Sequence, residues 1–167
     1  MVALQCLQQG CSQKQIQGFL YRKRYFYHTN IKLKRMKSIL LSVLGLVLGA
    51  ITNGFLVQVG NQVISPPKGF DLTTDKGLAA AISHFEPIHF LFPFLAHALG
   101  TFVGAFFVSK MRVNRTLINA MAIGFAFLAG GVMMVLMLPA TPVWFILLDL
   151  IVAYLPMAYL GYKLGQR

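Results

Sequence analysis

Apolar residues along this chain gather into four long runs, separated by short polar or proline-rich segments. Each run has roughly the 20 residues that an α-helix needs to cross the hydrocarbon core of a bilayer. The pattern therefore predicts an all-α, polytopic membrane protein with a four-transmembrane-helix bundle. The predicted spans are residues 38–59, 87–109, 116–138 and 142–163.

The connections between the spans differ in length and in the helix signals that they carry. Residues 60–85 form the one substantial loop, in which Pro66, Pro67 and Gly69 mark irregular backbone. Thr74 is placed to cap a short helix over the sequence "DKGLAAAIS". Pro87 suits the first turn of the second span, because the N–H that proline lacks would be unpaired there.

Composition agrees with a membrane protein, and the distribution of charge predicts its orientation. Only 11% of the residues are charged, whereas soluble domains carry about 25%. The basic residues outside the first 35 positions lie mainly at the ends of apolar runs, and positive flanks stay on the cytoplasmic side. We therefore expect both termini to be cytoplasmic. The basic flanks are Lys37, Lys110, Arg112, Arg115, Lys163 and Arg167.

The first 35 residues form a basic N-terminal arm with no acidic residue. Three interpretations compete: a cytoplasmic basic tail, an organelle-targeting segment, or upstream sequence that is not in the natural product. We expect the arm to be disordered or not part of the natural protein. Cys6 and Cys11 have no zinc-site spacing and no second pair, so neither a disulfide framework nor a metal finger is predicted.

The second span raises a chemical question, because polar residues in lipid are costly and tend to face protein. On a helical wheel, one face carries Glu86, His89, Pro93 and His97. The fourth span places Asp149 at a depth between the two histidines, and the first span places Asn53 in the same outer half of the bilayer. We expect Asp149 to face the bundle interior, within hydrogen-bonding or water-bridged reach of His97 or His89.

Each feature of this predicted cluster also has a structural interpretation. Glu86 follows Ser83 at the spacing of a capping box, and His97 would serve equally well as a hydrogen-bonding contact between helices. An intramembrane acid such as Asp149 is a functional-site hypothesis by default. Met133, Met134 and Met137 are more typical of packing than of ligand binding.

Small residues and prolines predict how the helices pack and bend. Three small-residue steps indicate close helix packing: Gly45–Gly49, Gly100–Gly104 and Ala126–Gly130. Pro93 and Pro156 leave the carbonyls of His89 and Val152 without an N–H partner, so both prolines are predicted to kink their helices.

The sequences "GFDLTT", "FEPIHFLFPFLAHALGTFVGAFF" and "WFILLDLIVAYLPMAYLG" resemble a group of small bacterial four-span integral membrane proteins of unassigned function. The resemblance covers roughly residues 36–167. It implies a multi-pass protein of the bacterial inner membrane, and it implies no activity.

Three functional hypotheses follow. The first is a membrane interaction or accessory protein, whose polar groups stabilise a bundle or an oligomer. The second is a small transporter or proton- or cation-linked carrier that uses the Asp/His/Glu cluster, and four spans would need a homo-oligomer to enclose a pathway. The third is a membrane enzyme that acts on a lipid or quinone, although no recognisable catalytic motif is present. We expect the lipid bilayer as partner, and we expect no nucleic acid, cofactor or metal.

Overall fold

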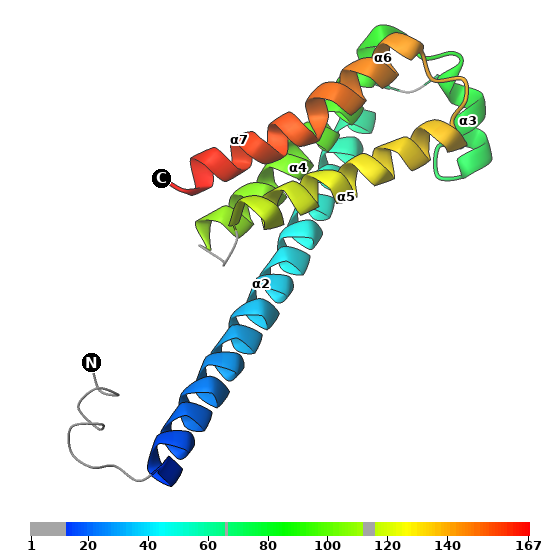
Figure 1. The fold of residues 1–167 in the computed structure, drawn as a ribbon. Coiled ribbons are helices and arrows are strands. Elements are labelled where there is room, and N and C mark those ends of the chain that lie inside the picture. Colours follow the sequence, from blue (N-terminus) through cyan, green and yellow to red (C-terminus); the bar gives the residue numbers. More distant parts are fainter. Residues whose placement is uncertain (1–12, 66, 112–115) are drawn as a thin grey trace. The chain divides into compact units, whose positions relative to one another are not determined.

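The computed structural model describes residues 13–65, 67–111 and 116–167, and this part of the chain is helical, without strands. Figure 1 shows the order of the elements. They are α2 (Gln13–Val63), α3 (Asp75–Ile82), the 3-10 helix η1 (Pro87–Phe90), α4 (Leu91–Lys110), α5 (Thr116–Met137), α6 (Val143–Leu148), the π-helix η2 (Asp149–Ala153) and α7 (Leu155–Gly165).

Four helical segments are long and apolar enough to cross a membrane, which agrees with the predicted all-helical, four-span class. They are Leu20–Val63, Pro87–Lys110, Thr116–Met137 and Val143–Gly165. The last three lie within one or two residues of the predicted spans at each end. The first begins well before the predicted span, because helical structure continues back into the basic arm.

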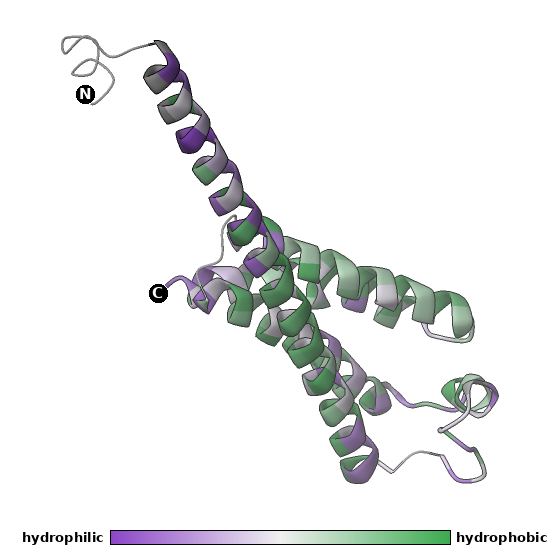
Figure 2. Cartoon of the chain, turned by 90° about the horizontal axis from the view of Figure 1, so that it is seen from below, coloured by the Kyte–Doolittle hydropathy of each residue, from purple (hydrophilic) through white to green (hydrophobic). Residues whose placement is uncertain are grey.

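The chain divides into two units, with the division between Lys37 and Ser38. The described part of the first unit belongs to α2, so from Gln13 onward the arm is helical, where disorder was expected. The segment from Gln13 to Lys37 lacks proline and is rich in Gln, Lys and Arg, which are good helix formers. Figure 2 shows that hydrophilic residues are frequent in this part of α2 and that hydrophobic residues predominate in the turns that follow. Cys6, Cys11, Arg112 and Arg115 lie outside the described residues.

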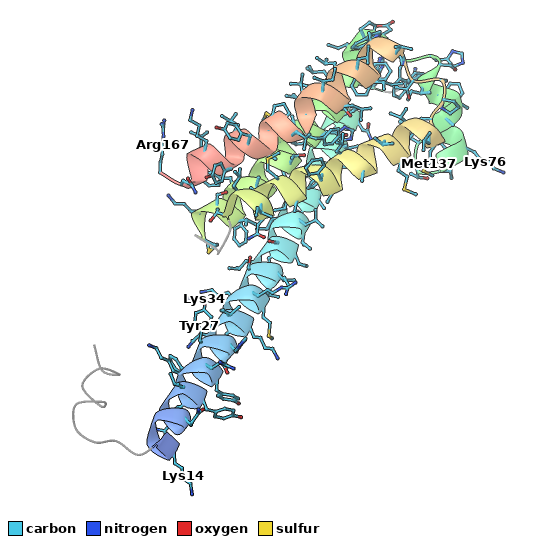
Figure 3. All side chains as sticks on the ribbon, viewed as in Figure 1. Lys14, Tyr27, Lys34, Lys76, Met137 and Arg167 are labelled. Atoms are coloured by element: carbon cyan, nitrogen blue, oxygen red, sulfur yellow. The ribbon has the colours of Figure 1, made fainter. Side chains whose placement is uncertain are left out.

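Side chains of the N-terminal part of α2 are exposed. Figure 3 shows the labelled Lys14, Tyr27 and Lys34 projecting from this helix. Tyr27 is 65% exposed. The helix in this unit therefore gains little from burial against the described chain, and the helix propensity of its residues favours it locally.

In the second unit, helices α4, α5 and α7 pack against one another (Figure 1). Ala105, Ala120 and Ala158, one from each helix, are fully buried where the three meet. A Cβ atom built at Gly161 would lie 2.6 Å from the carbonyl oxygen of Phe102, so α7 approaches the backbone of α4 closely. Small residues permit this approach, which membrane bundles need because lipid supplies little hydrophobic driving force between helices.

Two of the predicted small-residue steps face each other. A Cβ atom built at Gly49 would lie 2.5 Å from the carbonyl oxygen of Gly100, and one built at Gly45 would lie 2.9 Å from that of Gly104. The apolar part of α2 therefore packs backbone to backbone on α4.

The third predicted step, Ala126–Gly130, does not pack closely against the described residues. Both residues are exposed, and no described atom outside the helix's own neighbouring backbone lies within 4 Å of a Cβ built at Gly130. The close contacts of α5 are made instead by Gly124, against Ala158, and by Gly131, against Tyr154. Because an α-helix turns about 100° per residue, the step from Gly130 to Gly131 changes the face.

Both prolines that were predicted to kink their helices lie beside irregular helical turns. Pro93 is the third residue of α4, directly after η1, which contains His89. Pro156 is the second residue of α7 and follows η2, which contains Val152. Each proline withholds the N–H that would have bonded to the carbonyl four residues earlier, so the backbone departs from α geometry there. The predicted fourth span is consequently built as α6, η2 and α7.

At one end of the bundle, α3 contributes to a small hydrophobic cluster. Thr74 caps α3 as predicted, since its hydroxyl accepts a hydrogen bond from the N–H of Gly77. Gly69 has a φ of 95°, which favours glycine, in the turn that leads to this helix. The cluster contains Ile82, Phe90, Leu138 and Phe145.

Candidate functional site

Asp149 is the first residue of the π-helix η2, and it is buried, with 4% of its surface exposed. Its position in the chain, within a segment apolar enough to span a membrane, makes an unpaired carboxylate costly. The structure supplies two hydrogen-bonding partners, one from α4 and one from the same segment.

The first partner is His97 of α4, whose Nδ1 donates or accepts according to where the proton resides. Its Nδ1 atom lies 2.9 Å from Oδ1 and 2.9 Å from Oδ2 of Asp149. The wheel and depth arguments from the sequence predicted a contact between Asp149 and His97 or His89, and the contact with His97 is present. The pair joins α4 to η2, two elements that pack together.

The second partner is Tyr154, which the sequence analysis did not select. Its hydroxyl donates to Oδ2 of Asp149 at 2.8 Å and lies 3.0 Å from Nδ1 of His97. The Tyr154 side chain is fully buried, and its ring stacks on the imidazole with centroids 5.7 Å apart. We name Asp149, His97 and Tyr154 the buried triad.

The reason Tyr154 was missed is the winding of the helix. Residues five apart on an α-helix lie about 140° apart in azimuth, which would turn Tyr154 away from Asp149. A π-helix bonds residue i to residue i+5 and brings such residues onto one side. Pro156, two residues after the tyrosine, was the available signal, because it disfavours continuous α geometry over this stretch.

The other nitrogen of His97 has no hydrogen-bond partner among the described residues. The imidazole is partly accessible, with 21% of the side chain exposed. No fully buried side-chain nitrogen or oxygen atom in the described chain lacks a partner, so Nε2 must be accessible. The triad therefore satisfies Asp149 and leaves one ring nitrogen of His97 for another molecule.

Glu86 and His89 do not join the triad; they form a separate junction at the start of the second membrane segment. The backbone N–H of Glu86 donates to Nδ1 of His89 at 3.1 Å, which leaves Nε2–H of His89 to donate to the carbonyl of Ser65 at 3.3 Å. The predicted capping box with Ser83 is not formed, since the Ser83 hydroxyl donates to Ala80. His89 satisfies the Glu86 N–H more directly, being three residues later in the turn.

Asn53 approaches the triad without a hydrogen bond to any described residue. It lies on α2 beside α4, where a Cβ built at Gly100 would be 3.0 Å from the Asn53 Cβ. It lines the same groove as His97 and Tyr154.

An apolar cavity of about 220 Å³ lies against the triad. His97 and Asp149 are among its lining residues, and Asn61, His89 and Thr141 supply further polar groups. Most of the other lining side chains are aliphatic or aromatic. They include Val57, Ile64, Leu72, Leu78, Ile82, Phe85, Phe90, Phe92, Val135, Leu138 and Phe145.

A second, more open hollow of about 550 Å³ runs along α2 and α5. We name it the α2–α5 groove. Its lining includes Leu46, Ala50 and Asn53 from α2, together with Gly130 from α5. Met133, Met134 and Met137 also line it, and Figure 3 labels Met137 at the end of α5. The groove shares four lining residues with the cavity: Val57, His97, Gly131 and Met134. The two hollows therefore adjoin at His97.

The described residues place no three His, Cys, Asp or Glu side chains where they would hold one metal ion. The chemistry that the site offers is hydrogen bonding and proton exchange at His97, backed by a buried carboxylate and a phenol.

Comparison with known proteins identifies no relative. No protein-family model matches the chain, and no curated protein or solved structure matches it either. The likeness to small bacterial four-span membrane proteins stays a prediction, and function has to be argued from the site.

Proposed function

We propose that this protein is an integral membrane protein that binds a lipid-soluble small molecule in the cavity beside His97. The observation that carries the proposal is the position of the triad: His97, whose Nε2 has no hydrogen-bond partner among the described residues, lines a mostly apolar cavity. Ligand sites generally combine mostly apolar walls with a few placed polar groups.

The proposed setting is the inner membrane of a bacterium, with both termini cytoplasmic. The support is the distribution of basic residues, which flank the membrane segments on one side. In this orientation α3, the loop before it and the cavity belong to the extracytoplasmic half of the protein.

The hypothesis of an interaction or accessory protein is the second candidate, and one observation favours it. Ala126 and Gly130 present a small-residue face that no described residue covers, and such faces join helices in membranes. A second copy of the chain would be the partner. This hypothesis accounts for the hydrogen bonds within the triad, but it does not account for the cavity.

The transporter and enzyme hypotheses receive less support. Glu86 and His89 are bonded at a separate junction, and no hydrogen bond among the described residues links them to Asp149, as a direct proton relay would need. Binding requires only the cavity and His97, and it is therefore the function that the geometry supports best.

A pair of matched substitutions tests ligand binding. Val135 lines the cavity, whereas Val132, on the same helix, is 42% exposed and lines neither hollow. The protein would be placed in lipid nanodiscs with a medium-chain alkane that carries a photoactivatable diazirine, and cross-linked residues would be mapped by mass spectrometry.

Cross-links at cavity residues such as Phe92 are expected in the wild type and in Val132→Phe, and a several-fold loss is expected in Val135→Phe. Labelling confined to lipid-facing residues in all three proteins would reject the proposed binding function.

A further inference from the structure

We infer that the ligand presents an uncharged carbonyl group, which accepts a hydrogen bond from Nε2–H of His97. This inference rests on the proposed binding function and names the chemical class of ligand for the same site. The first argument concerns where the protons of Asp149 and His97 reside. The second is that no Lys or Arg is among the described residues that line the cavity.

The proton count begins with the cost of charge in a membrane. A net charge in the hydrocarbon region is expensive, whereas a neutral pair is tolerated. Two neutral arrangements of Asp149 and His97 give every proton at this contact an acceptor. In one, a carboxylate faces an imidazolium, and both ring nitrogens carry protons. In the other, the carboxylic acid donates to Nδ1, and the proton of the neutral imidazole resides on Nε2. A third, with an acid O–H beside an Nδ1–H, would leave either the acid or the Tyr154 hydroxyl without an acceptor among the described residues.

Both neutral arrangements fit the geometry. Nδ1 lies 2.9 Å from each carboxyl oxygen, so either an N–H or an O–H can occupy this contact. Tyr154 donates to Oδ2 in both cases. The two arrangements differ at Nδ1 and agree at Nε2, which is a hydrogen-bond donor in each. The group that meets Nε2 must therefore be an acceptor.

The residues around the cavity exclude an anionic acceptor. The lining set contains no Lys or Arg among the described residues, and its one acid is Asp149 itself. A carboxylate or phosphate head would enter an apolar space without a counter-ion and beside an existing carboxyl group, which is costly. An uncharged acceptor avoids this cost, and the carbonyl of a ketone, ester or quinone is the strong acceptor that lipid-soluble molecules carry.

The sizes of the cavity and of the α2–α5 groove indicate where the rest of the ligand would lie. The cavity of about 220 Å³ is smaller than the roughly 300–1,000 Å³ of common ligand pockets. It accommodates a head group and a short part of a tail. The α2–α5 groove, which adjoins it at His97 and Gly131, supplies an apolar path for the remaining tail along exposed Gly130. A single-chain molecule whose carbonyl lies near one end fits both volumes.

The test uses three probes of equal chain length in nanodiscs: a methyl ketone labelled with carbon-13 at its carbonyl, the corresponding alcohol, and the alkane. Infrared difference spectra report the labelled carbonyl stretch. A hydrogen bond from His97 would move the protein-dependent band to lower frequency than the same ketone shows in protein-free nanodiscs.

The matched variant replaces all three triad side chains, so that no member remains buried without a hydrogen-bond partner. His97→Leu, Asp149→Leu and Tyr154→Phe are combined, because an apolar replacement of a whole buried polar group is tolerated better than removal of one member. Thermal unfolding confirms that the variant is folded. The control is Val132→Phe.

We expect the shifted band in the wild type and in the control, and its loss in the triple variant. Ketone affinity should fall roughly fivefold to tenfold in that variant, while alkane binding is retained. A protein-dependent band without the shift, a shift that persists in the triple variant, or an alcohol that binds more tightly than the ketone would overturn the carbonyl inference alone. Absence of binding for all three probes would overturn the proposed function together with it.

Discussion

The hydroxyl of Tyr154 lies 2.8 Å from Oδ2 of Asp149, five residues earlier in the same membrane segment. The contact exists because the intervening residues form a π-helix. π-Helical turns are rare and are frequent at functional sites. Here the turn brings a phenol to a buried carboxyl group that already contacts a histidine from another helix.

Removal of that phenolic hydroxyl tests its contribution to the bundle. Tyr154→Phe should destabilise the protein by about 1–3 kcal/mol, because a buried carboxyl oxygen loses a donor. Tyr159→Phe is the control, since Tyr159 is exposed and should tolerate the change. Unfolding in mixed detergent micelles measures both. Equal stability of the two variants would show that the Tyr154 hydroxyl contributes nothing to folding.

Asp149 and His97 should be energetically coupled. Asp149→Leu removes the carboxyl group that pairs with His97 and Tyr154 and should cost about 3–5 kcal/mol, whereas Asp149→Asn retains an oxygen and should cost less. The double variant Asp149→Leu with His97→Leu should cost less than the sum of the single changes. A double-mutant cycle on unfolding free energies measures the coupling. Simple additivity would contradict it.

The packing of α2 on α4 depends on the absence of a side chain at Gly49. Gly49→Ala places a Cβ atom 2.5 Å from the carbonyl oxygen of Gly100, so the helices must separate, at a cost of about 1–3 kcal/mol. Gly54→Ala, on the same helix with no neighbour within 4 Å of the added Cβ, should be neutral or stabilising by up to about 1 kcal/mol. Thermal stability in nanodiscs distinguishes the two. Equal stability of Gly49→Ala and Gly54→Ala would show that the close approach of Gly49 to Gly100 imposes no packing constraint.

Outside the membrane segments, Asp71 should respond to the loss of a hydrogen bond. Its carboxylate accepts from the hydroxyl of Thr73 at 2.6 Å and from the backbone N–H of Thr73 at 3.0 Å, and these bonds lower the pKa of Asp71. A lowered folded-state pKa means that the stabilising contribution is present above the unfolded pKa and is lost as the pH falls through the folded one.

Thr73→Ala should therefore raise the pKa of Asp71 toward its ordinary value, and Thr73→Ser should preserve the lowered pKa. An NMR pH titration of the Asp71 carboxyl carbon measures both variants. An unchanged titration in Thr73→Ala would leave the backbone N–H as the sole cause of the shift.

The proposed orientation is tested by reporter fusions. A reporter joined after Arg167 should be cytoplasmic, and one inserted at Gly69 should be extracytoplasmic, because basic residues flank the membrane segments on the other side from the long loop. Each site would carry, in separate fusions, one reporter that is active only in the cytoplasm and one that is active only outside it. The two signals at a site then control for each other. A cytoplasmic signal at Gly69 would reverse the topology.

Several features could be predicted from the sequence because they depend on order along the chain. Long apolar runs predict membrane-spanning helices wherever they occur, since backbone hydrogen bonds in lipid must be satisfied within the segment. Thr74 identified the start of α3 through its local capping bond. The contact between Asp149 and His97 was also predictable, because an intramembrane acid needs a donor at matching depth and α4 supplies one.

Other features were decided by the tertiary structure, because they depend on azimuth and helix rotation. Tyr154 reaches Asp149 through π-helical winding, and Gly131 packs inward where Gly130 was expected, one residue and about 100° away. His89 shares a face with His97 on an ideal helical wheel. In the structure it lies in the 3-10 helix η1, and its side chain bonds to the carbonyl of Ser65 and not to Asp149. Residue order determines which segments enter the membrane. The rotation of each helix about its axis, set by packing against its neighbours, determines which polar groups meet.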